Sequence, residues 1–99
     1  MRTVMVRYRV KPEHVAENEG LIGKVYDQLG RETPGGLHYA TYKLEDGVSF
    51  VHIATLAVEG NNPLLELASF KAFTSGIKER CDELPHTTPV TRVGAYEPR

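Results

Sequence analysis

Alternation of apolar and polar side chains is the strongest pattern in the chain. It runs through the first ten residues, MRTVMVRYRV, and predicts a β-strand with one strongly apolar face. Residues 37–44 and 49–58 are rich in aromatic and β-branched residues. The turn Glu45-Asp46-Gly47 joins them, so they predict a hairpin in which Gly47 supplies a positive φ. A last strand is predicted over residues 88–96.

Apolar residues spaced three and four positions apart predict two helices between these strands. The first begins at Pro12, where the missing N–H of proline costs nothing, and ends before Thr33. The second is expected to be capped by Ser69, to carry an apolar stripe that reaches Cys81, and to end at Leu84-Pro85.

The resulting order, βαββαβ, predicts an α+β fold of the ferredoxin-like type for a single domain of residues 1–99. Four antiparallel strands form one sheet, and both helices cover the same face of it. Right-handed crossovers place the first and third strands in the centre of the sheet.

Charge and cysteine content exclude several classes of partner. The chain has 12 basic and 13 acidic residues, so it lacks the basic field that nucleic acid or an anionic membrane surface requires. The single cysteine excludes an intramolecular disulfide and fits a reducing cytoplasm. No window approaches 18 apolar residues, so no membrane-spanning segment is expected.

The third predicted strand has two apolar faces, but the helices can cover only one face of the sheet. Its other face would leave Val51 and Ile53 in water, with Met5 beside them. Such a patch is typical of an association surface and predicts a homodimer made by packing sheet on sheet. The alternative is a monomer with a modestly apolar outer face, which Arg7 and Arg9 favour.

The register of the hairpin decides the neighbours of a histidine in the third strand, His52. A three-residue turn, which the sequence favours, places His38, Tyr42 and His52 on one face. A two-residue turn instead places His52 beside Thr41 and moves His38 to the opposite face.

A polar residue that faces a core needs a partner or a water-filled cavity. Asn18 interrupts the apolar stripe of the first helix, and His52 is expected on the helix side of the sheet. These two residues and His38 are therefore the expected polar groups of an otherwise apolar pocket. Its expected aromatic walls are Tyr8, Tyr42, Phe70 and Phe73.

His52 is the candidate catalytic base, because a histidine near its intrinsic pKa suits proton removal from a phenol or an enol. The alternative is a core histidine that is bonded to a neighbouring hydroxyl or carbonyl group. A metal held by His38 and His52 would need a third ligand, and no carboxylate is well placed to supply one. Cys81 lies on the apolar helical stripe and is expected to be a small buried hydrophobe.

The element order, the length, the hairpin LHYATYKLEDGVSFVHIATL and the terminal run VTRVGAYEP together resemble the antibiotic biosynthesis monooxygenase domain of the dimeric α+β barrel superfamily. The resemblance implies a dimer whose sheets face each other, and a ligand cavity in each subunit between sheet and helices. Characterised members oxidise quinols and anthrones with dioxygen and use no metal or flavin, so no cofactor is expected. The chain has no tryptophan, so no catalytic set of that family transfers to it residue by residue.

A second branch of the superfamily degrades haem. This chain has no histidine between Leu64 and Cys81, where that branch places its haem ligand. The leading functional hypothesis is therefore a cofactor-independent monooxygenase for a small aromatic or quinol-type substrate. The alternatives are a non-catalytic dimer that binds a small molecule in the same cavity, and a structural dimer whose pocket has collapsed.

Overall fold

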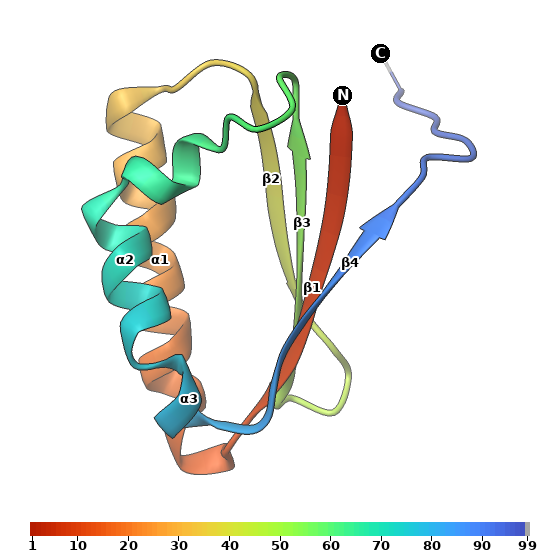
Figure 1. The fold of residues 1–99 in the computed structure, drawn as a ribbon. Coiled ribbons are helices and arrows are strands. Elements are labelled where there is room, and N and C mark those ends of the chain that lie inside the picture. The colour runs from red at the N-terminus through yellow and green to blue at the C-terminus, as the bar shows by residue number, and fades with distance from the viewer. Residues whose placement is uncertain (99) are drawn as a thin grey trace.

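The computed structural model describes residues 1–98 and confirms the βαββαβ order as one antiparallel sheet backed by helices (Figure 1). The strands are β1 (Arg2–Val10), β2 (Leu37–Lys43), β3 (Ser49–Leu56) and β4 (Cys81–Val90). Their order in the sheet is β2-β3-β1-β4, with β1 and β3 in the centre as predicted. No helix within residues 1–98 is long and apolar enough to cross a membrane.

The helices lie together on one face of the sheet (Figure 1). A 3₁₀ turn, η1 (Pro12–His14), leads into α1 (Val15–Glu32). Thr33, with a φ of 43°, ends α1 and donates its backbone N–H to the carbonyl oxygen of Leu29. The predicted start and end of the first helix are therefore confirmed.

The second helical region is more broken than its apolar stripe predicts. It consists of a 3₁₀ turn, η2 (Pro63–Glu66), then α2 (Ala68–Ser75) and a single turn, α3 (Ile77–Arg80). Ser69 lies inside α2 and does not cap it. Its backbone N–H and its hydroxyl both donate to Oε1 of Gln28, which fastens α2 to α1.

The last strand begins earlier than predicted: β4 runs from Cys81 to Val90, and residues 91–98 form no regular element. The pair Leu84-Pro85, which the sequence places at the end of a helix, lies inside this strand. The strand accepts the proline because β4 is an edge strand, and its pairing with β1 shifts register between His86 and Glu83, where Pro85 lies. Edge strands and bulges are among the places in a sheet that tolerate proline.

The hairpin has the register that places Thr41 opposite His52, so the favoured three-residue turn is wrong. The turn spans residues 45–48 and is held by Asp46. Its carboxylate accepts hydrogen bonds from the backbone N–H groups of Val48 and Ser49 and from the Ser49 hydroxyl, and these bonds lower the pKa of Asp46. Gly47 has the expected positive φ, at 78°.

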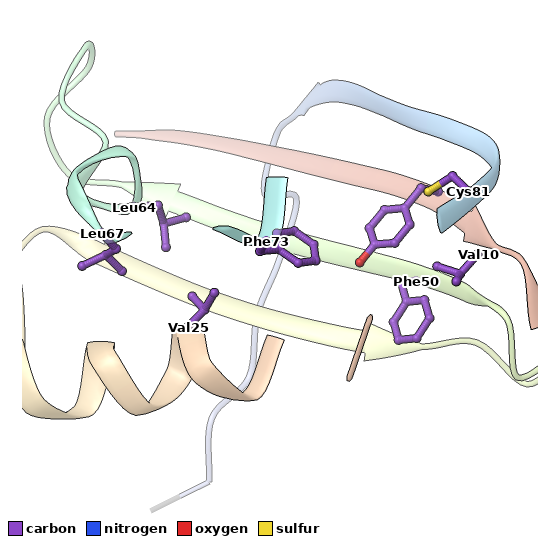
Figure 2. Close-up of a cluster of buried hydrophobic side chains, with 8 residues drawn as sticks. Val10, Val25, Phe50, Leu64, Leu67, Phe73 and Cys81 are labelled. Carbon is purple, nitrogen blue, oxygen red and sulfur yellow. The ribbon is translucent and has the colours of Figure 1, made fainter. Parts of the chain in front are cut away.

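The core lies between the helices and the inner face of the sheet (Figure 2). Its buried members are Tyr8, Val10, Val25, Phe50, Leu64, Leu67, Phe73 and Cys81. Cys81 is buried as expected, although it belongs to β4 and not to a helix. Alternate residues of β1 and β3 supply this layer, which leaves the residues between them on the outer face of the sheet.

Candidate functional site

A cavity of about 320 Å³ lies between the inner face of the sheet and the second helical region. Its walls are mainly apolar and include Phe70 and Phe73 of α2. Three polar rings interrupt this lining: Tyr8 from β1, Tyr39 from β2 and His52 from β3. The cavity thus has an apolar wall on the helix side and a row of hydrogen-bonding groups on the sheet.

His52 connects these rings, and it is only 4% exposed. Its Nε2 lies 2.7 Å from the Tyr8 hydroxyl oxygen, and its Nδ1 lies 2.6 Å from the Tyr39 hydroxyl oxygen. Thr41 Oγ1 is 3.1 Å from the same Nδ1, because the hairpin register sets Thr41 directly opposite His52. Both ring nitrogens are therefore engaged by protein hydroxyl groups.

A second set of bonds extends the network behind Tyr8. Asn18 of α1, which is fully buried, donates from Nδ2 to the Tyr8 hydroxyl oxygen at 3.1 Å. Arg80 donates from Nε to Asn18 Oδ1 at 3.1 Å and from Nη2 to the Phe73 carbonyl oxygen at 2.7 Å. A buried polar chain thus runs from Arg80 through Asn18 and Tyr8 to His52 and Tyr39.

Arg80 is the cation at one end of this buried polar network and is 2% exposed. No carboxylate within residues 1–98 forms an ion pair with it. Its guanidinium carbon lies 5.3 Å from the centre of the Phe73 ring, which is a cation–π contact. Gly76 leaves room for it, since a Cβ there would lie 3.2 Å from Arg80 Nη1. Burying an arginine without a carboxylate is costly, so its charge needs compensation from within the site.

Burial sets the protonation states in the network. It lowers the pKa of His52 to about 4, because the charged imidazolium is poorly solvated there, so the ring is neutral at pH 7. Burial raises the pKa of Tyr8 and of Tyr39 well above 10, so both are neutral phenols. The hydrogen bond from Asn18 and the charge of Arg80 oppose this rise at Tyr8.

Five of the residues predicted from the sequence meet at this site. Four of them line the cavity, and Asn18 bonds to one of these four; the set is Tyr8, Asn18, His52, Phe70 and Phe73. His38 and Tyr42 do not belong to it. In the observed register they lie opposite Thr55 and Val51, on the outer face of the sheet, so their predicted place in the pocket is wrong.

Sequence reasoning missed Tyr39 and Arg80, and it placed Thr41 beside His52 only in the alternative register. Tyr39 and Thr41 both follow from the observed register, because exchanging the faces of β2 turns its odd-numbered residues inward. Arg80 follows a Lys-Glu pair at a helix end and resembles an ordinary surface residue. The only signal for its burial is the glycine four residues before it, Gly76.

The described residues, 1–98, contain no group of three side chains that could hold a metal ion. The pair considered from the sequence, His38 and His52, lies on opposite faces of the sheet and cannot share one ion. The polar side chains that line the cavity are hydroxyls, the amide of Asn62 and an imidazole whose nitrogens are already bonded. They suit hydrogen bonding and proton transfer to an organic ligand better than metal coordination.

Comparison with known proteins identifies the fold. No family model matches the sequence, and no curated protein matches it. Among solved structures, a candidate antibiotic biosynthesis monooxygenase from Bacteroides thetaiotaomicron superposes with a TM-score of 0.80 at 14% identity, covering 99% of this chain and 94% of that one. The fold is that of the antibiotic biosynthesis monooxygenases.

Two further solved structures share this fold. One, named as an antibiotic biosynthesis monooxygenase, has a TM-score of 0.73 at 17% identity and covers 95% of this chain and 100% of its own. The other is a single-residue variant of SnoaB from Streptomyces nogalater, a cofactor-independent oxygenase. It has a TM-score of 0.69 at 16% identity and covers 95% of this chain and 94% of its own. At these identities the likeness establishes the monooxygenase fold, which the sequence resemblance predicted.

Proposed function

We propose that the protein is a cofactor-independent monooxygenase that oxidises a small aromatic or quinol-type substrate with dioxygen. The observation that carries this proposal is the apolar cavity whose sheet wall holds the Tyr8–His52–Tyr39 network. The similarity in fold to an oxygenase that works without a cofactor supports it.

The cavity suits a flat and mostly apolar ligand. Its volume of about 320 Å³ is at the lower end for small-molecule sites, so the ligand is expected to be compact. Phe70 and Phe73 offer ring faces to an aromatic substrate, and the hydroxyls on the opposite wall can orient its polar atoms.

His52 acts on the substrate through Tyr8 in this proposal, because neither ring nitrogen is free to touch a ligand. A proton from the substrate passes to the Tyr8 oxygen as Tyr8 gives its own proton to Nε2. The substrate anion then gives one electron to dioxygen, and the resulting radical and superoxide combine into a peroxide. Loss of water from this peroxide converts a ring CH₂ into a carbonyl group: one oxygen atom enters the product and the other leaves as water.

The positive charge of Arg80 stabilises negative charge that develops at Tyr8 or at a ligand bonded to it. The charge acts through Asn18, which accepts from Arg80 and donates to Tyr8. Fixed donors and charges in a dry site need no rearrangement as charge develops, so their effect is larger than in water. This role would also compensate the buried charge of Arg80, with which no carboxylate in residues 1–98 forms an ion pair.

The test is dioxygen uptake by purified, chelator-treated protein over a panel of quinols and anthrones. His52→Gln, which keeps one donor and one acceptor, is expected to lower uptake on the order of 10²-fold. His38→Gln is the matched control on the outer face and is expected to retain uptake. If His52→Gln consumes dioxygen as fast as the unaltered protein, the network is not the catalytic site.

A second candidate function is a non-catalytic protein that binds a small molecule in the same cavity. The low pKa of His52, about 4, favours this candidate because it makes the imidazole a weak base. The candidates differ in one result. A binding protein changes its tyrosine fluorescence on addition of an aromatic ligand but consumes no dioxygen with any compound of the panel.

The homodimer remains a proposal as well. Val51, Ile53 and Met5 are half-buried on the outer face of the sheet, and no helix within residues 1–98 covers that face (Figure 1). A second copy that packs face to face would remove these side chains from water.

A further inference from the structure

The hydrogen-bond network of His52 has a second arm that leads away from the cavity. Thr41 Oγ1, which lies 3.1 Å from Nδ1 of His52, also lies 2.8 Å from the hydroxyl oxygen of Tyr26 in α1. The lining of the cavity includes neither Thr41 nor Tyr26. A continuous chain of hydrogen bonds therefore connects His52 with a different part of the molecule.

This arm ends in an open groove between α1 and β2. The groove has a volume of about 260 Å³, and its lining includes Tyr26, Thr41 and a pair of oppositely charged residues, Glu19 and Lys43. Lys43 Nζ lies 2.9 Å from Glu19 Oε2, and both side chains are half-exposed. Solvent and a carboxylate are thus present at the outer end of the arm.

Both hydroxyl groups of the arm can pass a proton along. Burial raises the pKa of Tyr26, and its bond to Thr41 opposes this rise, so the phenol is neutral at pH 7. A neutral hydroxyl donates its own hydrogen while it accepts another. Each link of the arm can therefore take up one proton and release another in the same movement.

We propose that Thr41 and Tyr26 form a proton outlet, which carries a proton from Nδ1 of His52 to solvent at the groove while a ligand occupies the cavity. The use of this outlet in turnover rests on the proposed function. The outlet itself can be measured without substrate and without dioxygen.

The transfers balance at every atom. When Nε2 of His52 receives a proton through Tyr8, the Nδ1 proton moves to Thr41 Oγ1. The Thr41 hydroxyl proton moves to the Tyr26 oxygen, and the Tyr26 proton goes to water in the groove. One proton has left the substrate and one has entered solvent, and His52 remains neutral.

The same path resets the site. The peroxide anion that forms from the substrate anion and dioxygen takes back the Nε2 proton through Tyr8. Nδ1 then regains a proton from solvent through Tyr26 and Thr41. His52 returns to its first tautomer, and no electron passes through the outlet at any point.

Two features of the site give the outlet a purpose. Burial lowers the pKa of His52 to about 4, so the ring holds a second proton poorly. Tyr39, the other partner of Nδ1, lines the cavity, so a proton passed to it stays inside the site with the ligand. The outlet removes the proton on the opposite side, while the negative charge of the ligand stays beside the network that contains Arg80.

The experiment measures how fast the ring N–H hydrogen of His52 exchanges with water, by NMR of protein labelled with ¹⁵N-histidine at pH 7. Thr41→Val keeps the shape of the side chain and is expected to slow exchange on the order of tenfold, as is Tyr26→Phe. Thr41→Ser restores the hydroxyl group and is expected to retain the rate, which a loss of packing alone would not explain. Tyr42→Phe, on the outer face of β2, is the matched control.

The double variant Thr41→Val with Tyr26→Phe is expected to exchange no more slowly than either single variant, because each breaks the same path. Exchange in Thr41→Val and Tyr26→Phe that is as fast as in the unaltered protein would overturn the inference. The ring proton would then leave through the cavity.

Turnover separates the outlet from the proposed function. With a quinol or anthrone that the protein oxidises, Thr41→Val is expected to lower kcat on the order of tenfold with KM unchanged, and Thr41→Ser is expected to retain kcat. Oxidation with an unchanged kcat in Thr41→Val would leave the monooxygenase in place and overturn the outlet. Slowed exchange without dioxygen uptake from any compound would support the outlet and contradict the proposed function.

A cover over the groove tests the path without altering the arm, and it applies even if an arm variant does not fold. Gly23 is exposed and lines the groove, and a Cβ there meets open space. Gly23→Leu is expected to slow exchange, because its side chain would keep water from Tyr26. Gly20→Leu, one turn earlier, meets open space as well but does not line the groove, so it is the matched control. Equal exchange rates in the two leucine variants would contradict an outlet at this groove.

Discussion

The burial of His52 makes the stability of the fold depend on pH in a way that one substitution can isolate. The pKa of His52 is lowered to about 4 in the folded protein, against 6.5 for the exposed side chain of the unfolded chain. Between these values the unfolded chain binds a proton that the folded protein does not. Protonation of the unfolded chain at His52 therefore hardly reduces the free energy of unfolding above pH 6.5. The free energy of unfolding falls as the pH is lowered from 6.5 towards 4.

The magnitude follows from the two pKa values. Proton linkage over this interval removes about 3 kcal/mol from the free energy of unfolding between pH 7 and pH 4. His52→Gln cannot take up this proton, so the linkage is absent from the variant. At pH 7 the variant is expected to be less stable, because it loses ring contacts with Tyr8 and Phe73. The difference in the free energy of unfolding between the unaltered protein and His52→Gln is expected to be about 3 kcal/mol smaller at pH 4 than at pH 7.

The assay is urea unfolding followed by circular dichroism at several pH values from 7 to 4. Protein concentration is held constant, since a dimer would make stability depend on concentration. The carboxyl groups contribute alike to both proteins and cancel in the comparison. His38→Gln, at an exposed position on the outer face, is the control. If the curves for the unaltered protein and His52→Gln remain parallel from pH 7 to 4, the histidine is not held neutral by burial and the reasoning is wrong.

Three further predictions concern the turn, the buried cation and the outer face. Asp46→Ala removes three hydrogen bonds from the hairpin turn and is expected to lower the midpoint of urea unfolding; an unchanged midpoint would show that the turn does not depend on them. Asn18→Leu leaves Arg80 and the Tyr8 hydroxyl without their shared partner and is expected to cost about 2–3 kcal/mol. Stability equal to that of the unaltered protein would mean that water replaces the amide. Ile53→Lys is expected to convert a dimer into a monomer in light scattering, whereas Lys71→Glu on the exposed side of α2 is not; a dimeric Ile53→Lys would place the interface elsewhere.

The inner face of β1 was predictable because this strand alternates over its whole length. In β1, Tyr8 and Val10 are fully buried while Arg7 and Arg9 remain exposed, as the period of two requires. β3 is apolar on both faces, and the face of His52 was predicted to meet the helices because it carries the bulkier side chains, among them Phe50 and Leu56. The position of His52 in the core followed from these neighbours and not from any property of histidine.

The register of β2 was not predictable from its composition, because both of its faces carry aromatic and polar residues. The turn sets the register of the hairpin, and the carboxylate of Asp46 stabilises the turn. Asp46 bonds to the backbone two and three residues later, as acidic residues do at the start of a turn, and Ser49 at the third position was a readable sign of this motif. Because this motif was not recognised, the prediction placed Tyr42 in the pocket, where the structure has Tyr39.

The two prolines of β4 also bear on how the protein avoids unwanted assembly. An exposed sheet edge offers free N–H and C=O groups that can recruit a strand from another molecule and start aggregation. On β4, Pro85 sits at a bulge and Pro89 pairs with Val4, and neither has an N–H to offer along the free edge. Growth of the sheet by added strands is therefore obstructed on this side. The proposed face-to-face dimer, by contrast, would be closed once two copies had paired.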